Sequence, residues 1–412
     1  MFARFALALC VALTALTARA ADPTAEELVE DGKRHADSKR YAAAIESFTA
    51  ALKLEPKHPL ALLYRGDAHQ SSGDIFAAMR DYNEATVVAP WDARGFIGRG
   101  QIRHLLGVND KAEADQSVAI QLDPKNEIAF VCRGATRFAL GKFEAARTDL
   151  TEAIRLNPAS ATAYHNRGVM WSAAGEMKKA IADFTDALRI DPTRAVTYYA
   201  RGSLHVPDVD KMLEDFGNAI RFDPENAVHL VTRSSLYRLF KGDLDAALKD
   251  ATAAIKANPK FLGGYLERAT IRIERRDWTG ASADLDEAVK LGPNSLNAHL
   301  VRAYHLAQCP DEKLRDAVQA SKDAKRACDL TEWKHPFALA AFARTGAALG
   351  DYDSAVKWQK KALENALYKH LTGEEGEQLL RQYENRRAPD ELIRPVILPE
   401  IAGFSLVAIP KG

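Results

Sequence analysis

The sequence lacks any excess of charge: 56 basic and 56 acidic residues among 412 give a formal net charge of zero. Nucleic acids and anionic membrane surfaces select for a basic excess in the proteins that bind them. We therefore expect neither as the main partner. Charged residues make up 27% and apolar residues 47% of the chain, which favours a packed chain over a disordered one.

Long apolar runs are also missing, except near the N-terminus. Phe5 to Ala18 carries no charge, follows Arg4, and leads into the small residues of Ala18-Arg19-Ala20. This order is typical of a secretory signal peptide, and the run is too short to span a bilayer. We predict a signal peptide over residues 1–20 and an exported mature chain, periplasmic or secreted, without a membrane span. A transit peptide or a lipid anchor at Cys10 remains open.

Cysteine is scarce, and three cysteines remain after the predicted cleavage: Cys132, Cys309 and Cys328. An odd number leaves at least one thiol free or bridged to another chain. Cys309 and Cys328 flank a predicted helix of about 15 residues, which would separate them by about 20 Å. A disulfide cannot cover that distance, so we predict no intrachain bridge.

The sequence contains none of the common catalytic motifs, whether H-E-x-x-H, C-x-x-C, G-x-S-x-G or the P-loop. The eleven histidines are scattered, and His299 and His305, six residues apart, do not share a helix face. We therefore predict no enzymatic activity and neither cofactor nor metal. An enzyme would need a site within residues 296–412, where the sequence pattern is irregular.

What the sequence has in abundance is one repeated phrase. Proline recurs at positions 56, 90, 124, 158, 192, 224, 259 and 293, and the first five are each 34 residues apart. Upstream of each proline after the first an arginine precedes a small residue, and a glycine usually lies midway. Two helices of about 12 residues fit this period, because glycine favours the end of the first and proline stops the second. Such a hairpin buries its apolar face only by stacking on its neighbours.

The fifth copy, "YHNRGVMWSAAGEMKKAIADFTDALRIDP", resembles the tetratricopeptide repeat family in its aromatic residues, Gly168, Gly175, Ala180, Ala187 and closing proline. The resemblance covers residues 25 to 369 and implies an all-α fold, a right-handed superhelical solenoid of about ten helical hairpins. The phrase "ACDLTEWK", residues 327–334, resembles a subtype known from exported and multidomain bacterial proteins.

The repeat boundaries follow from the period. We predict repeats over 25–58, 59–92, 93–126, 127–160, 161–194, 195–226, 227–261, 262–295, 296–335 and 336–369. Three repeats have turns of unusual length. The turn of the sixth repeat, at Val206-Pro207, is two residues shorter than usual, that of the seventh is one residue longer, and that of the ninth is about five residues longer. A polar capping helix is expected at 373–386 and an extended tail at 387–412.

The arginine of each repeat has an aspartate 16 residues later, and the offset changes to 14 or 17 where the turn length changes. The aspartate thus keeps its place in the hairpin, as an ion pair between its two helices requires. The predicted structural pairs are Arg65–Asp81, Arg99–Asp115, Arg133–Asp149, Arg167–Asp183, Arg201–Asp215, Arg233–Asp250 and Arg268–Asp284, with Arg302–Asp323 across the swollen turn. In the tenth repeat both positions are apolar, Phe342 and Trp358.

The resemblance implies that repeat positions 2, 5, 6, 9 and 12, on the first helix, line an inner groove. Its partner-binding candidates are Tyr64, Asp67, His104, His165, Asn166, Tyr199 and Arg238. Family members that bind an acidic C-terminus use lysine or arginine and asparagine there, and only Asn166 fits. An extended or helical segment with apolar anchors suits this groove better. Some of these residues could instead contact neighbouring repeats.

Together these features predict a non-catalytic scaffold or adaptor that binds a protein or peptide segment in its groove, in complexes of the cell envelope. Two alternatives to this scaffold remain open: an enzyme with its site in residues 296–412, and a purely structural or small-ligand-binding solenoid. Two further hypotheses concern the C-terminal region. Trp333 and Trp358 pack in the core or form a second interaction surface, and the apolar run Phe404–Ile409 folds back into the groove.

Overall fold

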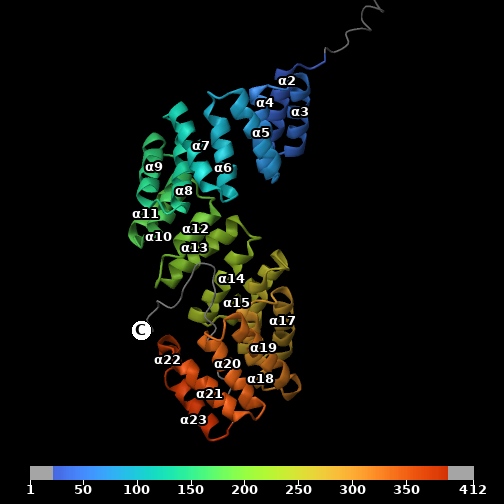
Figure 1. Cartoon of the computed structure of the whole chain (residues 1–412), viewed down its shortest axis with the longest axis vertical. Coiled ribbons are helices and arrows are strands. Elements are labelled where there is room, and N and C mark those ends of the chain that lie inside the picture. Colours follow the sequence, from blue (N-terminus) through green and yellow to red (C-terminus); the bar gives the residue numbers. More distant parts are fainter. Residues whose placement is uncertain (1–21, 388–412) are drawn as a thin grey trace, which may run out of the picture. The chain divides into compact units, whose positions relative to one another are not determined.

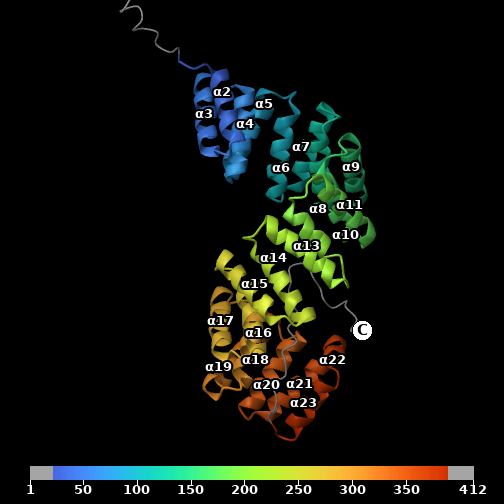
Figure 2. The same ribbon diagram turned by 180° about the vertical axis from the view of Figure 1, so that it is seen from behind.

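The computed structural model describes residues 22–387, so the predicted signal peptide and nearly all of the predicted tail lie outside the described residues. Every regular element between residues 22 and 387 is a helix, and successive helices pack as antiparallel hairpins (Figures 1 and 2). The predicted all-α fold of stacked hairpins is confirmed. The chain divides into two compact units, residues 1–192 and 193–412.

Unit 1 holds the first five repeats. Its helices are α2 (Ala25–Asp37), α3 (Tyr41–Leu54), α4 (Pro59–Ser72), α5 (Ile75–Val88), α6 (Ala93–Leu105), α7 (Asn109–Leu122), α8 (Glu127–Ala139), α9 (Phe143–Leu156), α10 (Ala161–Ala173) and α11 (Met177–Ile190).

Unit 2 holds the remaining repeats and the C-terminal helices. Its elements are α12 (Ala195–Gly202), α13 (Val209–Phe222), α14 (Ala227–Leu236), η1 (Tyr237–Lys241), α15 (Leu244–Ala257), α16 (Leu262–Glu274), α17 (Trp278–Leu291), α18 (Leu296–Gln308), η2 (Glu312–Leu314), α19 (Ala317–Leu330), α20 (Pro336–Ala348), α21 (Tyr352–Leu363), α22 (Ala366–Thr372) and α23 (Glu374–Glu384).

The fifth repeat shows how the local sequence builds a hairpin. The Ser160 side chain caps α10 by accepting a hydrogen bond from the Ala163 backbone N–H. Gly175 follows the helix with φ of 77°, a left-handed conformation that glycine adopts without steric cost. Where α10 crosses α11, a Cβ on Gly168 would lie 2.7 Å from the Phe184 ring, so the close approach requires glycine.

The same backbone turn forms in repeats that lack the glycine. Lys39 and Arg276 take its place in the first and eighth repeats, with φ of 57° and 64°. Left-handed backbone is unfavourable for side chains other than glycine, asparagine and aspartate. The packing of the two helices therefore imposes the turn, and glycine only eases it.

The irregular repeats deviate where the sequence predicts, with one correction. In the sixth repeat α12 ends early, at Gly202, and in the ninth the short 3-10 helix η2 fills the swollen turn. The extra residue of the seventh repeat does not lengthen the turn as predicted. It lies in a π-helical turn, η1, that continues α14, because a wider helical turn absorbs one residue without breaking the helix.

The C-terminal end carries one helix more than expected. The short helix α22 precedes the capping helix, which runs from Glu374 to Glu384. Leu379 and Tyr383 of α23 are buried against Ala343 and Ala347 of α20, so this helix closes the apolar face of the tenth repeat.

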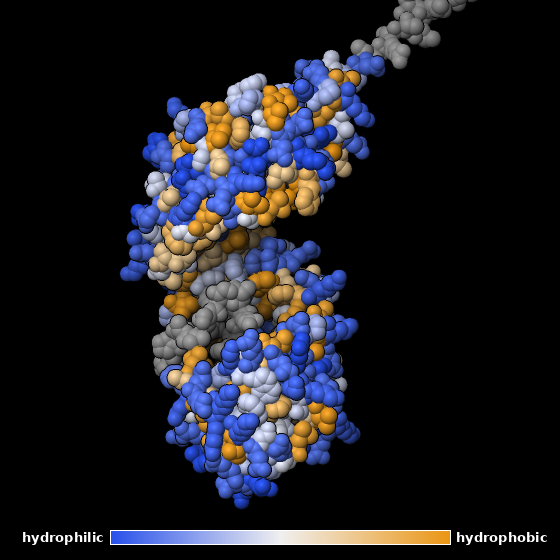
Figure 3. Space-filling model, viewed as in Figure 1, coloured by the Kyte–Doolittle hydropathy of each residue, from blue (hydrophilic) through white to orange (hydrophobic). Residues whose placement is uncertain are grey.

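The outer surface of each unit is mixed. Figure 3 shows apolar side chains interspersed with polar ones over the visible face of each unit. Phe76, Val87 and Trp91 are the most exposed large apolar residues, at 71 to 78%. Within residues 22–387, no helix is long and apolar enough to cross a membrane.

Candidate functional site

Each predicted arginine–aspartate pair is present and bidentate. The arginine Nε and Nη2 atoms lie 2.6 to 2.9 Å from the two oxygens of the aspartate in all seven predicted pairs and in Arg302–Asp323. The aspartates are 5% exposed or less. Asp183 therefore raises the pKa of Arg167 through this hydrogen bond, against the opposing effect of burial.

The third guanidinium nitrogen makes a contact that the sequence reasoning missed. Nη1 reaches the second helix of the preceding repeat, where it donates to a polar side chain. The recorded acceptors are Thr49 for Arg65, Thr86 and Asn83 for Arg99, Ser117 for Arg133, Thr151 for Arg167 and Asp286 for Arg302, at 2.7 to 3.4 Å. In these five cases a polar residue lies 16 positions before the arginine, and that spacing was the signal that could have revealed this link.

The end repeats replace the pair. At the corresponding positions of the first repeat, the Ser47 hydroxyl donates to the Asp31 carboxylate at 2.9 Å. In the tenth repeat the Phe342 and Trp358 ring centroids lie 6.2 Å apart, and Trp333 lies 4.6 Å from Trp358. Trp333 and Trp358 are thus partly buried and pack against the core of this repeat, which agrees with the hypothesis that they are packing residues.

Tyr64 and Asp67 share a face of α4 with a polar group that comes from the second helix. Tyr82 of α5 is 1% exposed, yet its hydroxyl donates to Asp67 at 2.6 Å. Its ring occupies the space beside Gly66 and Gly98, where a Cβ would lie 2.8 and 2.4 Å from it. The two glycines therefore allow Tyr82 to reach the first-helix face.

This packing affects the ionisation of Asp67. Burial raises the pKa of Asp67, although the Tyr82 hydrogen bond and the charge of Arg94 act against the rise. Burial is also the main cause that raises the pKa of Tyr82, and the negative charge of Asp67 raises it further. Asp67 nevertheless keeps an exposed surface, so a ligand can contact its carboxylate.

The other candidates of unit 1 lie on separate helices. His104 ends α6 and its Nδ1 lies 2.8 Å from Asn109 Oδ1. The His165 ring on α10 packs 5.5 Å from Phe184, and its neighbour Asn166 is partly exposed. His165 and Asn166 are neighbours in the sequence of α10, and the structure places Tyr64 and Asp67 on one face of α4.

The two candidates of unit 2 take part in packing between repeats. The Tyr199 ring stacks on His229 of the next repeat at 4.9 Å, and burial lowers the pKa of His229. Arg238 is only 10% exposed at its side chain and forms ion pairs with Glu267 at 2.9 Å and Glu274 at 3.2 Å. Arg238 therefore joins repeats seven and eight and is not presented to a partner as we expected.

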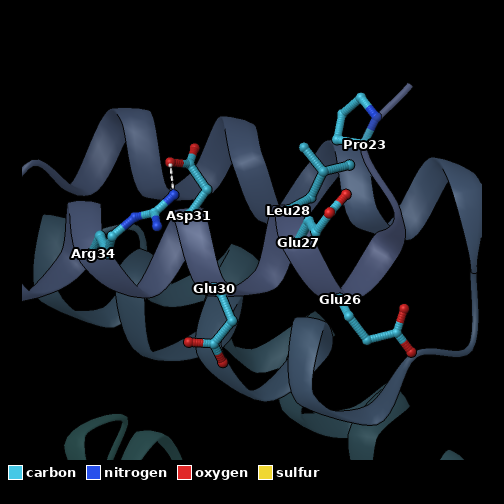
Figure 4. A pocket seen from close by; sticks show the side chains of 7 residues that line it. All are labelled: Pro23, Glu26, Glu27, Leu28, Glu30, Asp31 and Arg34. Atoms are coloured by element: carbon cyan, nitrogen blue, oxygen red, sulfur yellow. Dashed lines mark hydrogen bonds and ion pairs between the residues drawn. The ribbon is translucent and has the colours of Figure 1, made fainter. Parts of the chain in front are cut away.

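Two solvent-open hollows lie beside helices of unit 1, and one of them includes Glu26 and Glu30, groove positions 2 and 6 of the first repeat. One, of about 630 Å³, runs along α2 beside Glu26, Glu30 and Asp31, with Arg34 paired to Asp31 at 3.0 Å (Figure 4). The other, of about 400 Å³, lies beside the Arg65–Asp81 pair. Neither brings together groups with the geometry of a catalytic site.

One side-chain group has the composition of a metal site. Glu26, Glu55 and His58 bring ligand atoms within 4.8 Å of one another. His58 Nδ1, however, accepts a hydrogen bond from the Ala61 N–H at 3.3 Å, as the cap of α4. A neutral ring that accepts at Nδ1 carries its proton on Nε2, so neither nitrogen has a lone pair free for a metal. The group fits a helix cap better than a metal centre.

Comparison with known protein families adds to these observations. Family models described as "Tetratricopeptide repeat" match residues 29–93, 133–195, 234–295 and 338–367, together more than half of the chain. Among curated proteins, the E3 ubiquitin-protein ligase CHIP of Arabidopsis thaliana is 30% identical over 91 residues. That match covers 22% of this chain and spans only 31% of the length of the relative.

Solved structures are similar at lower identity. A tetratricopeptide repeat protein from Parabacteroides merdae is 20% identical, with a TM-score of 0.38, over 68% of this chain and 97% of that one. The P58(IPK) TPR domain is 17% identical, with a TM-score of 0.35, over 88% and 98%. The MamA protein is 23% identical, with a TM-score of 0.33, over 40% and 92%. No conclusion about function follows from these values.

Proposed function

Because this chain is built of tetratricopeptide repeats, we propose that it is a non-catalytic scaffold that binds a peptide or protein segment along the first helices of its repeats. Tetratricopeptide repeats generally mediate contacts between proteins. The observation that carries the proposal is the contrast between two sets of positions in each repeat.

The first set is nearly the same in every repeat and holds the hairpin together. It comprises the small residue after the arginine, the buried alanines of the second helix and the arginine–aspartate pair, all of which are used in packing. The second set, at groove positions 2, 5, 6, 9 and 12, changes from repeat to repeat. Variable side chains on a constant scaffold are what recognition of a specific partner requires.

The chemistry of unit 1 favours a segment with apolar anchors and a few polar contacts. Leu60 and Ile128 occupy position 2 of their repeats and are 36% and 48% exposed. Asp67, held by the Tyr82 hydroxyl, offers a fixed hydrogen-bond acceptor on the same helix as Leu60. Apolar side chains of a partner would supply binding energy by packing on Leu60 and Ile128. The N–H groups of the partner would donate hydrogen bonds to Asp67.

Photocrosslinking tests this assignment. A photoreactive phenylalanine analogue replaces Leu60 on α4 or, as a matched control, Phe76 on α5, an apolar residue that is 71% exposed on a second helix. The proposal expects a defined crosslinked partner from position 60 and none from position 76. An Asp67→Lys change in the same protein should weaken the crosslink from position 60. Equal crosslinking from both positions would contradict the use of the first-helix face.

We further propose that residues 1–20 direct export, so that the scaffold acts in the cell envelope or outside the cell. The charged start, the apolar run and Ala18-Arg19-Ala20 support this. Mass spectrometry of the protein from a bacterial periplasmic fraction should find Ala21 as the first residue. A chain that is recovered in the cytosol with its Met1 intact would disprove export.

A further inference from the structure

One buried arginine of unit 2 lies outside the repeated arginine–aspartate pairs, since the paired positions of the tenth repeat hold Phe342 and Trp358. Arg344 lies on α20 of the tenth repeat and is 4% exposed. Its Nη1 donates to the Gln308 amide oxygen at 2.6 Å, while its Nε has no hydrogen-bond partner in the described part of the chain. Among residues 22–387, no carboxylate lies within ion-pair distance of this guanidinium.

Tyrosines surround the guanidinium. It lies over the Tyr304 ring of α18 at 5.1 Å, and the Tyr383 hydroxyl of α23 is close to it but outside ordinary hydrogen-bond geometry. Burial raises the pKa of Tyr383 to about 12, with the positive charge of Arg344 acting against that rise. At neutral pH the hydroxyl is therefore protonated and able to donate. We call Arg344, Tyr304, Gln308 and Tyr383 the Arg344 cluster.

A buried guanidinium without a counter-ion is costly. Removing a charge from water is offset only when an opposite charge or a full set of hydrogen bonds replaces the hydration. A neutral amide and an aromatic face supply part of this, and the Nε–H and the Tyr383 O–H remain as two buried donors. Two donors beside a cation are the arrangement that a carboxylate accepts from.

We propose that the Arg344 cluster is a binding site for the carboxylate of an extended peptide segment. Its two donors come from α20 and α23 and its other residues from α18, and they differ from the lysine and asparagine set that family members use in adjacent repeats. An acidic side chain that enters the cluster accepts from Arg344 Nε and from Tyr383 and supplies the counter-ion that Arg344 lacks among residues 22–387.

Two sources present this chemistry. The chain itself carries Asp390, Glu391 and Glu400 beyond α23, and Asp390 follows Tyr383 by seven residues. Seven extended residues span at most about 25 Å, and a tethered group acts at a high effective concentration. The other source is a separate peptide, and for that source the inference rests on the proposed function.

Nuclear magnetic resonance of the arginine Nε–H groups in the full chain provides the test. Arginine-selective ¹⁵N labelling and an Arg344→Met variant identify the Arg344 signal, and the paired Arg268 serves as internal control. A triple variant, Asp390→Asn, Glu391→Gln and Glu400→Gln, removes the carboxylates of the chain's own segment. The probe for a separate source is acetyl-Ala-Glu-Ala-amide, which has one carboxylate and blocked ends.

If the chain's own segment occupies the site, the triple variant shifts the Arg344 signal, and the probe binds the variant but not the unaltered chain. If a separate peptide is the ligand, the triple variant changes nothing and the probe shifts the Arg344 signal of the unaltered chain. In the first case Arg344→Met is added to the triple variant, and in the second to the unaltered chain. In both cases it should weaken probe binding at least tenfold, and the Arg268 signal should stay constant.

Two outcomes would overturn the proposal. Glu375, at the start of α23, is near enough to affect the pKa of Tyr304. A shift of the Arg344 signal on Glu375→Gln, with none from the triple variant or the probe, would make Glu375 the counter-ion. An Arg344 signal that no carboxylate affects would show that the cluster needs none. Neither outcome bears on crosslinking from Leu60 in unit 1, which tests the proposed function separately.

Discussion

The interior repeats and the end repeats solve the same packing problem in different ways. Repeats two to nine join their helices through an arginine that binds its own aspartate, and in the recorded cases the arginine also reaches a polar side chain of the preceding repeat. The first repeat has no repeat before it, and a serine and an aspartate replace the pair. An arginine on the first helix there would have no preceding helix to supply an acceptor for its third nitrogen. Asp31 occupies that position instead and accepts from Ser47 of the second helix.

The tenth repeat fills the same place with aromatic rings. Phe342 and Trp358 pack with Trp333, which the turn after α19 supplies. Apolar groups of similar volume often replace a buried ion pair without loss of stability, whereas the loss of one partner is strongly destabilising. The comparison teaches that the hairpin requires a matched pair at these positions, ionic or apolar.

The largest expected effect comes from breaking one pair. Asp183→Ala leaves Arg167 without its carboxylate and should lower the free energy of unfolding by about 3 kcal/mol. The double variant Arg167→Phe/Asp183→Trp copies the tenth repeat and should lose clearly less. Urea unfolding of the full chain, followed by circular dichroism, measures both. If the two variants lose the same stability, matched pairing is not what these positions require.

Removing one ring from the apolar pair should have the next largest effect. Trp358→Ala leaves Trp333 and Phe342 without their partner and should cost about 2 kcal/mol, somewhat less than truncation of a fully buried ring. Trp91→Ala is the control, since Trp91 is 71% exposed and its loss should change stability by less than about 0.5 kcal/mol. Similar melting shifts for the two variants would place Trp358 outside the core.

The link between repeats should contribute less than the pair within a repeat. Thr86→Val keeps the shape of the side chain but removes the acceptor that lies 2.7 Å from Arg99 Nη1, and it should cost about 1 kcal/mol. Thr86→Ser retains the hydroxyl and should retain most of the stability. A valine variant as stable as the serine variant would show that the third nitrogen does not stabilise the stack.

The smallest expected effect is a difference in pH dependence. Lowering the pH should weaken the ion pair of an interior repeat but not the apolar contacts of the tenth repeat. Burial raises the pKa of Asp323, but hydrogen bonds from His299 and Arg302 outweigh it and leave the pKa below its ordinary value. The pair thus contributes its full stability above about pH 4, the ordinary aspartate value, and loses it as the pH falls through the lower folded-state pKa. The stability difference between the wild type and Asp323→Asn should therefore shrink from pH 5 to pH 3.

The difference for Trp358→Ala should remain constant over the same range, because no titrating group takes part in that contact. Melting temperatures at matched ionic strength measure both series. An Asp323→Asn difference that does not change with pH would mean that its carboxylate does not stabilise the folded state through its charge.

Local, periodic features of the sequence predicted most of the fold. The 34-residue period, the glycine after the first helix and the proline after the second are signals within a few residues of the structure they specify, and the aspartate offset follows from the hairpin itself. Predictions for the groove were less complete. Arg238 was expected to be presented to a partner, but Glu267 and Glu274, which bind it, lie 29 and 36 residues away.

The helical hairpins and the pairing within each of them could be predicted from the residues alone, because those contacts recur at one spacing and depend on neighbours inside the repeat. Which side chains remain free for binding depended on the three-dimensional structure. It showed that Tyr82 reaches the face of Asp67 between two glycines, that Arg238 binds Glu267 and Glu274 of the next repeat, and that Arg344 is buried without a carboxylate partner among residues 22–387. These depend on distances between helices that differ in every repeat, which no periodic pattern records.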